Sequence, residues 1–359
     1  MPAKRADATR RPLPAFPEGR VRGPDCPMAA RPEIDPASPL QFVINSAAGS
    51  GDADTRREVI ETALRSAGRR GELLFASPSA LARVAHEAAA RAIELGTAVV
   101  AVGGDGTLNT VAQAAHSAGC AMGLVPQGTF NYFARAHGIP ADPAKAVRLL
   151  LRSAPVPVQV AGVNDRIFLV NASLGLYPEL LEDREAYKAR FGRSRWVAFW
   201  AAGATLLRAQ RQLRLHIEQG ASVRDVRTLT LFVGNNRLQL EHLGVQPKQR
   251  PVGGPMHARI TALMLRPIGT LAMIRLMLHG AMGTLGEAQS VERFEFEHMV
   301  VRPTLMRGRR GVKIAFDGEV TTMRAPLEFR VLARPLHLMI PPRDDPAVDT
   351  ALEAGRAGR

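Results

Sequence analysis

The sequence predicts two domains: an α/β domain built on a parallel sheet, followed by a mainly antiparallel β-sandwich. In residues 38–155, short valine-rich runs alternate with amphipathic stretches of helical spacing. This pattern is typical of buried parallel strands with helices on both faces. In residues 156–340, short strand-like runs follow one another between turn residues, as in antiparallel sandwiches. Pro155 and Pro157 mark the change between the two patterns.

In the first domain we expect four strands, three helices and a Rossmann-like arrangement. The expected strands are Leu40–Asn45, Glu72–Phe75, Ala98–Val102 and Met122–Val125. The expected helices are Thr55–Ala67, Ser79–Leu95 and Leu108–Ala118. Gly68 and Gly96 directly follow the first two helices, where glycine favours helix termination.

The second domain is expected to consist of short strands with two helical interruptions. The expected strands are Val158–Val163, Ile167–Ala172, Thr228–Val233, Arg259–Leu265, Val291–Glu297, Val312–Phe316, Leu327–Leu332 and Leu336–Ile340. The expected helices are Arg195–Gln212 and Ile268–Leu285. Residues 1–37 are rich in arginine and proline without periodicity, which predicts a disordered arm, and residues 341–359 are expected to form a tail.

Composition narrows the range of partners. The 359 residues carry a formal net charge of +14, and most of the basic residues are arginine. Such a surface favours nucleotide phosphates, an anionic membrane or nucleic acid. No nucleic-acid-binding motif is present, so we do not expect a nucleic-acid partner. The longest apolar run, Trp196–Leu207, is about half of the ~20 residues that a membrane span needs. Two cysteines and no apolar leader favour a cytoplasmic protein.

Three loops rich in glycine and small polar residues follow strands of the first domain. They are residues 45–51, beginning with Asn45 and containing Gly49, residues 103–107 (Gly-Gly-Asp-Gly-Thr), and residues 126–131 (Pro-Gln-Gly-Thr-Phe-Asn). Such loops gather at the carboxyl edge of a parallel sheet, where ligands bind. Glycine lets the backbone approach phosphate oxygens, and helix N-termini direct their amides at negative charge. Asp105 stands among glycines, which a simple connecting turn would not require.

The second and third loops together resemble the signature of the diacylglycerol kinase catalytic domain, a family shared with sphingosine kinases, ceramide kinases and bacterial lipid kinases. The resemblance covers most of residues 40–333 and includes Asn171–Gly175 and Asp317-Gly318-Glu319. It implies an ATP- and Mg²⁺-dependent lipid kinase, which acts on a hydroxyl group of a diacylglycerol-like or sphingoid-like lipid. The substrate would lie at an anionic membrane surface, on the inner face of the membrane.

The resemblance also implies roles for individual residues. Glu319 would be the catalytic base, and Asp105 would act through magnesium or by fixing its own loop. The nucleotide would be bound by Asn45, Gly49, Ser77, Gly104, Asp105, Gly106, Thr107, Leu108, Asn109, Thr110 and Thr129. Gly253 stands where bacterial members carry an Asp at a magnesium site, so the ligands of the metal are left unassigned.

Several alternatives remain open from the sequence. Asp317-Gly318 is also a favoured hairpin pair, so this turn can be purely structural. The stretch Arg193–Arg211 suits an interfacial helix with basic residues, or a helix packed on the sandwich. Among rival functions, an NAD kinase shares the Gly-Gly-Asp-Gly turn. The departures at Thr110 and Gly253 also fit a nucleotide-binding regulator with weakened catalysis.

Overall fold

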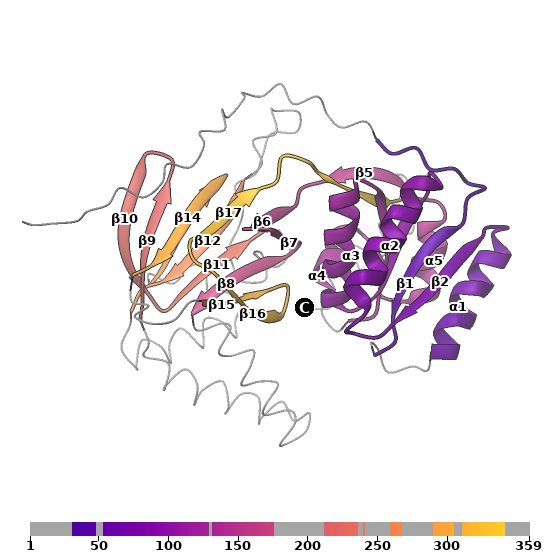
Figure 1. Ribbon diagram of the computed structural model, residues 1–359, viewed down its shortest axis with the longest axis horizontal. Coiled ribbons are helices and arrows are strands. Elements are labelled where there is room, and N and C mark those ends of the chain that lie inside the picture. The colour runs from indigo at the N-terminus through magenta and orange to yellow at the C-terminus, as the bar shows by residue number, and fades with distance from the viewer. Residues whose placement is uncertain are drawn as a thin grey trace, which may run out of the picture. The chain divides into compact units, whose positions relative to one another are not determined.

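A computed structural model describes residues 31–47, 53–128, 131–175, 212–235, 240, 259–267, 290–304 and 311–341. Its strands form three six-stranded sheets (Figure 1). The first contains all the expected strands of residues 38–155, and the other two contain the antiparallel strands that follow. Within this described part, no helix is long and apolar enough to cross a membrane.

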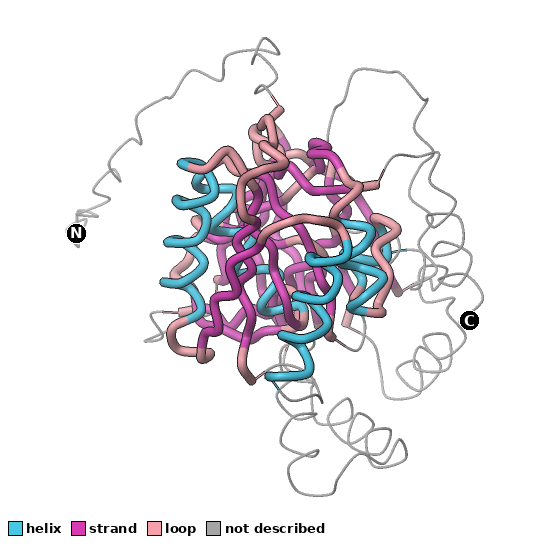
Figure 2. Tube along the Cα trace, turned by 90° about the vertical axis from the view of Figure 1, so that its right-hand side faces the viewer, coloured by secondary structure: helices cyan, strands magenta, loops and turns pink. Residues whose placement is uncertain are grey.

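The first sheet has the strand order β2-β1-β3-β4-β18-β5. Strands β1 to β4 run parallel, as expected, because buried runs such as Ala98–Gly103 are connected by helices. Helix α1 packs against α5 and α2 packs against α3, and Figure 2 shows helices on both sides of the strands. The bounds are β1 Leu40–Asn45, α1 Ala53–Ser66, β2 Gly71–Ala76, α2 Leu81–Glu94, β3 Ala98–Gly103, α3 Asp105–Ala118, β4 Ala121–Pro126, α4 Tyr132–Ala136, α5 Pro143–Leu150 and β5 Ala154–Val158.

The prediction for Leu336–Ile340 was right about the strand and wrong about its sheet. This strand, β18, pairs in parallel with β4 and antiparallel with β5, so it lies in the first sheet and not in the sandwich. Leu336, Leu338 and Met339 are buried in the apolar core of the first sheet. The physical reason is that the parallel sheet would otherwise end at β4. The backbone groups on one edge of β4 would then be unpaired, and its apolar side chains would lie at the edge of the sheet.

The remaining strands form two antiparallel sheets, in the orders β10-β9-β14-β17-β6-β7 and β13-β12-β11-β8-β15-β16. Alternate side chains of both sheets meet in one apolar core, which confirms the expected sandwich. The bounds are β6 Ala161–Val163, β7 Arg166–Phe168, β8 Asn171–Gly175, β9 Leu213–Gln219, β10 Ser222–Thr228, β11 Thr230–Gly234, β12 Ile260–Leu265, β13 Val291–Phe296, β14 His298–Pro303, β15 Val312–Phe316, β16 Glu319–Met323 and β17 Leu327–Val331.

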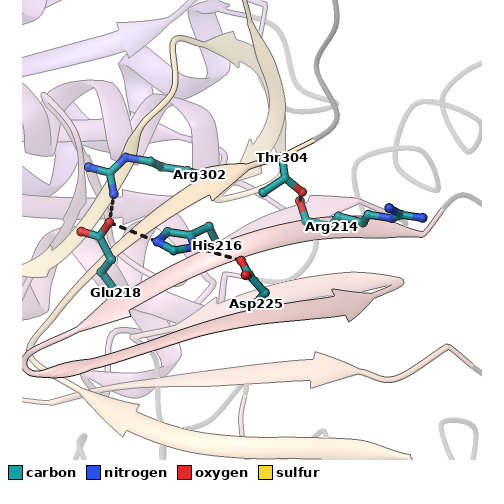
Figure 3. A network of polar contacts seen from close by, with 6 residues as sticks. All are labelled: Arg214, His216, Glu218, Asp225, Arg302 and Thr304. Carbon is teal, nitrogen blue, oxygen red and sulfur yellow. Dashed lines mark hydrogen bonds and ion pairs between the residues drawn. The ribbon is translucent and has the colours of Figure 1, made fainter. Parts of the chain in front are cut away.

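Polar side chains join three neighbouring strands on the exposed face of the second sheet (Figure 3). His216 on β9 lies between two carboxylates, with Nδ1 2.9 Å from Asp225 Oδ1 and Nε2 3.5 Å from Glu218 Oε1. Glu218 also pairs with Arg302 of β14. Cross-strand pairs of opposite charge help to fix the register of such strands. Among the described residues, no group of His, Cys, Asp and Glu side chains has the arrangement of a metal site.

Candidate active site

The Gly-rich loop 103–107 forms the transition from β3 to α3. Gly103 ends β3, Gly104 is the N-cap, and Asp105 begins the helix. The first hydrogen bond within the helix runs from the Leu108 amide to the Gly104 carbonyl, at 3.0 Å. The amides of residues 105–107 therefore precede the hydrogen-bonded turns and lie at the positive end of the helix dipole. This arrangement provides donors for a phosphate group at the carboxyl edge of the sheet.

The three loops predicted to share one site do lie together where the structure describes them. In the third loop, a Cβ built at Gly128 would lie 3.3 Å from Gly104 Cα and 3.6 Å from the Asp105 nitrogen. The Gln127 amide donates to the Gly103 carbonyl at 2.8 Å. In the first loop, Asn45 Nδ2 donates to Thr107 Oγ1 at 3.0 Å. Each loop thus contacts the α3 N-terminus.

The backbone of Gly104 does not itself require glycine. Its φ of −81° and ψ of −178° are open to any residue, so glycine is not required there for its dihedral freedom. A Cβ at this position would meet only Gly128 Cα, at 3.7 Å, which is an ordinary contact. Any requirement for glycine at position 104 therefore concerns the space beside the loop, which a phosphate would fill.

Glu319, the expected base, reaches the same helix terminus from the other half of the chain. It is the first residue of β16. A Cβ placed on Gly106 would overlap the Glu319 carboxylate, whose Cδ lies 2.9 Å from that position. The carboxylate therefore lies directly over the backbone of the Gly-rich loop. Gly106 leaves the space that this approach requires.

Asp317 fixes the turn that carries Glu319. Its carboxylate accepts hydrogen bonds from the amides of Leu169, Val170 and Asn171 at 2.7–3.0 Å, and from Asn109 Nδ2 of α3 at 2.7 Å. Asp317 and Gly318 both have positive φ, 47° and 90°, as a tight hairpin turn requires. Burial raises the pKa of Asp317, while its four hydrogen bonds favour the charged form. The turn is therefore both a hairpin and a connection to α3.

Asp105 lies in an environment that disfavours its charge. Burial, together with the nearby Asp317 carboxylate, raises the pKa of Asp105 to about 6. Its Oδ1 atom is buried and has no hydrogen-bond partner among the described residues. A buried carboxylate oxygen without a donor is costly unless a cation or another donor arrives. The local structure around Asp105 is therefore suited to a positively charged ligand.

Some of the predicted nucleotide-binding residues have side chains that contact other parts of the protein. The Leu108 side chain is buried in the apolar core and its amide is bonded within the helix, so it has no group for a ligand. Asn109 is buried, and its Nδ2 donates to Asp317 and to the Ile167 carbonyl. Thr110 Oγ1 donates to the Gly106 carbonyl at 2.9 Å. The side chains of these residues therefore support the loop, and their assignment to the nucleotide stays a prediction.

Other predicted residues are exposed or lie outside the described residues. Ser77 is exposed just after β2, at the same edge of the sheet as Asn45, and its Oγ lies 3.1 Å from Ser79 Oγ. Gly49, Thr129 and Gly253 are outside the described ranges, as are the expected helix Ile268–Leu285 and all but the last residue of Arg195–Gln212. For all of these, the assigned roles stay predictions.

Sequence reasoning missed two side chains that hold the loops. Arg56 on α1 is buried and donates to the carbonyls of Asn45 and Ser46, at 2.8 and 3.3 Å. Asn131 adopts a left-handed φ of 49°, and its amide both accepts from the Gly128 amide and donates to the Gly128 carbonyl. Asn is enriched at left-handed positions, so Asn131 could have been found from its place in the loop. Nothing in a run of helical residues distinguishes Arg56.

Comparison with known proteins gives consistent results. The model of the diacylglycerol kinase catalytic domain matches residues 39–163. A protein of Pseudomonas aeruginosa named probable lipid kinase YegS-like is 31% identical over 242 residues, which cover 65% of this chain and 72% of that protein. A protein of Klebsiella pneumoniae with the same name is 41% identical over 98 residues, 26% of this chain. The match spans only 33% of that second relative.

Among solved structures, a putative diacylglycerol kinase from Bacillus anthracis has a TM-score of 0.63. The alignment covers 87% of this chain and 98% of that one, at 18% identity. At this level of identity the likeness concerns the fold. It extends over the α/β part and the two antiparallel sheets, so the relation is not limited to the Gly-rich loops.

Proposed function

Because the chain belongs to the diacylglycerol kinase catalytic-domain family, we propose that it is an ATP-dependent lipid kinase. The enzyme transfers the γ-phosphate of ATP to a hydroxyl group of a membrane lipid, of the diacylglycerol or sphingoid type. It works in the cytoplasm, at the anionic inner face of the membrane, where its excess of arginine contributes to attraction.

The observation that carries this proposal is the approach of Glu319 to Gly106. A phosphoryl transfer to an alcohol needs a base for the hydroxyl proton beside the site of the transferred phosphate. Glu319 is a carboxylate over the amino end of α3, where free amides favour phosphate. The first half of the chain thus supplies the phosphate-binding amides, and the second half supplies the base.

The proposed step moves one proton and one phosphoryl group. The lipid hydroxyl gives its proton to the Glu319 carboxylate while its oxygen forms a bond to the γ-phosphorus. The bond from the γ-phosphorus to the β–γ bridging oxygen breaks, and ADP leaves with that electron pair. Asp317 takes no part in the proton transfer, because its carboxylate is occupied by four donors. Its role is to hold the turn so that Glu319 faces the loop.

The residues at the α3 N-terminus fit a magnesium ion that arrives with ATP. The buried Asp105 Oδ1 has no donor, and oxygen ligands are those that Mg²⁺ prefers. Asp105 would hold the ion, and the phosphates and water would supply most of its other ligands. The ion would neutralise charge on the transferred phosphate. At a pH above about 6, Asp105 is ionised and suited to this task.

A radiolabelled ATP assay with lipids in detergent micelles tests the proposal. Glu319→Gln keeps the size of the side chain but cannot accept the proton, so we expect turnover to fall by ~10²–10⁴-fold with ATP binding retained. Glu297→Gln, on an exposed side chain paired with Arg259, is the matched control and should keep native turnover. A loss of less than about threefold in Glu319→Gln would remove the base from this mechanism.

The same assay separates the rival functions. Phosphorylation of NAD without any lipid product would establish an NAD kinase. ATP binding without turnover on any lipid hydroxyl would establish a regulator. The Gly104→Asp variant tests the position of the nucleotide site independently. A carboxylate beside the loop repels phosphate, so this variant should not bind ATP. Unchanged ATP affinity in that variant would place the nucleotide elsewhere.

A further inference from the structure

A hollow lies away from the Gly-rich loops, beside the carboxyl end of α5. This α5 cavity has a volume of about 720 Å³, which is within the range of small-molecule sites. It opens next to Leu40, the first residue of β1, whereas Asn45 ends the same strand at the nucleotide loops. Five residues of strand separate the two positions by roughly 17 Å. The α5 cavity is therefore distinct from the candidate active site.

The lining of the α5 cavity is apolar at its floor and carries a net positive charge. Its floor is apolar and comes from separate elements: Leu40 of β1, Leu150 of α5 and Met339 of β18, all buried. Its charged residues are Arg31, Arg69 and Arg152 against the single carboxylate of Glu33, a net of +2. An apolar floor with an excess of arginine at the opening complements a molecule with an apolar chain and an anionic head.

Arg69 retains unused capacity to bind an anion. Arg69 Nε is buried and has no hydrogen-bond partner in the part of the chain that the structure describes, which is costly for a charged donor unless a ligand supplies an acceptor. Neither Arg31 nor Arg69 has an ion pair within the described ranges of the chain. Asp35 lies close enough to Arg69 to be affected by its charge, yet its carboxylate is bonded to Ala37 and Ser38. Asp35 therefore does not occupy the place of the missing acceptor.

We propose that the α5 cavity binds a lipid with a phosphate head, with the apolar chain over Leu40, Leu150 and Met339 and the phosphate at Arg69 and Arg152. Arginine is suited to this head because its planar donors match phosphate oxygens in pairs. The occupant differs from free phosphate because a bare ion would leave the apolar floor uncovered. This site is independent of the proposed kinase activity.

Calorimetric titration of the full chain with three probes tests the chemistry. The probes are octyl phosphate, inorganic phosphate, which represents the head group alone, and octanol, which represents the apolar part alone. We expect octyl phosphate to bind at least about tenfold more tightly than either part, since burial of several methylene groups and a charge-assisted bond each contribute that much. Equal binding of inorganic phosphate and octyl phosphate would overturn the proposal, since the octyl group would then contribute nothing to binding.

Variants locate the binding. Arg69→Gln combined with Arg152→Gln should weaken octyl phosphate by at least about tenfold. Arg65→Gln removes the same kind of charge from an exposed position on α1 and should leave binding unchanged. Gly104→Asp should also leave it unchanged, which separates this site from the nucleotide loops. Loss of binding in Gly104→Asp, with native binding in the double variant, would contradict the proposal.

Hydrogen exchange on the native chain gives a test that needs no variant. Octyl phosphate should slow amide exchange in residues 33–40 and 150–155, which border the α5 cavity. Protection confined to other parts of the chain would show that the ligand binds elsewhere, even if the double variant proved unstable.

Discussion

The two glycines beside Asp105 differ in what a side chain would meet. Gly106→Ala puts a methyl group where the Glu319 carboxylate lies, whereas a methyl group at Gly104 makes only an ordinary contact with Gly128. The end of a Glu side chain moves easily, so we expect Gly106→Ala to fold normally and to displace the base. Turnover at saturating ATP should fall by at least about tenfold, part of what a general base contributes. Gly104→Ala should keep turnover closer to the native value.

Steady-state kinetics with varied ATP distinguish these effects, because displacement of the base lowers kcat and a filled phosphate space raises KM for ATP. Equal kcat values for Gly106→Ala and the native chain would show that the position of Glu319 over the loop is irrelevant to the reaction.

The pKa of Asp105 makes a prediction about stability and pH. Burial and Asp317 raise this pKa from an ordinary 3.8 to about 6. Between these values the folded state binds the proton and the unfolded state does not, so the contribution of Asp105 to stability falls as the pH rises from about 4 to about 6. Above pH 6 the folded state carries a partly buried, unfavourable charge.

Asp105→Asn should therefore be more stable than the native chain at pH 7. We expect a gain of about 1–2 kcal/mol, given about 1.4 kcal/mol for each tenfold change in proton affinity and some screening by solvent. Urea unfolding of both forms at pH 4 and pH 7 measures the difference, which should nearly vanish at pH 4. A native chain that is more stable than Asp105→Asn at pH 7 would contradict this account.

Asp317 should be among the most sensitive residues to substitution. Asp317→Asn tolerates the same left-handed backbone but presents an amide to donors that need an acceptor. Since unpaired buried donors cost ~1–3 kcal/mol each, we expect a loss of about 2–4 kcal/mol in the free energy of unfolding. Asp165→Asn, in the exposed β6–β7 turn, serves as control and should change it by less than about 0.5 kcal/mol. Similar stabilities of the two variants would mean that the hydrogen bonds of Asp317 contribute little.

At the scale of elements, α1 fixes the first loop through one buried side chain. Arg56→Met removes both hydrogen bonds to the loop carbonyls while keeping an apolar stem of similar length. We expect ATP affinity to fall by about tenfold, because the loop is no longer held against β1 and Thr107. The next residue provides a control: Arg57→Met loses a contact with the Phe75 ring, worth ~0.5–1 kcal/mol. Fluorescence titration with an ATP analogue measures both, and equal affinities would exclude this role for Arg56.

Elements with strong local signals were predictable from the sequence. The bounds of β1, β15 and β18 agree with the expected ranges, because apolar runs between turn residues define them. Helix α5 was missed although Asp142 and Pro143 form a good helix start, with Asp142 Oδ1 accepting from the Lys145 amide. Strands β9 and β10 were missed although alternation around the Gly220 turn indicates a hairpin. These three elements were therefore predictable from local sequence and were not recognised.

Other features could not be read from local sequence at all. The partners of Asp317 lie about 150 and 208 residues away along the chain. The sheet that β18 joins is likewise decided by burial of its side chains against β4, not by any pattern inside the strand. The residues of the three glycine loops were identifiable, but the division between loop-lining and supporting residues, as at Leu108 and Asn109, required the fold.

At the scale of the whole molecule, β18 is required for the first sheet. A chain that ends at Leu332 lacks this strand, leaves β4 paired only with β3 and removes Leu336, Leu338 and Met339 from the core. Each large apolar residue lost from a core costs ~2–5 kcal/mol, so the sum reaches the total stability of ~5–15 kcal/mol of a typical domain. We expect this chain to lack cooperative thermal unfolding by circular dichroism. A chain ending at Pro342 retains β18 and is the matched control. Cooperative unfolding of both would show that the strand is dispensable.

The position of β18 in the sequence also determines when the first sheet can be completed during synthesis on the ribosome. Strand β4 ends at Pro126 and β18 begins at Leu336, about 210 residues later. At ~5–20 residues per second, the nascent chain waits roughly 10–40 s between these two strands. Throughout that interval the apolar edge of β4 is open to other chains. Synthesis of this protein is therefore expected to depend on chaperones that bind nascent chains, and ribosomes that stop early release fragments prone to aggregation.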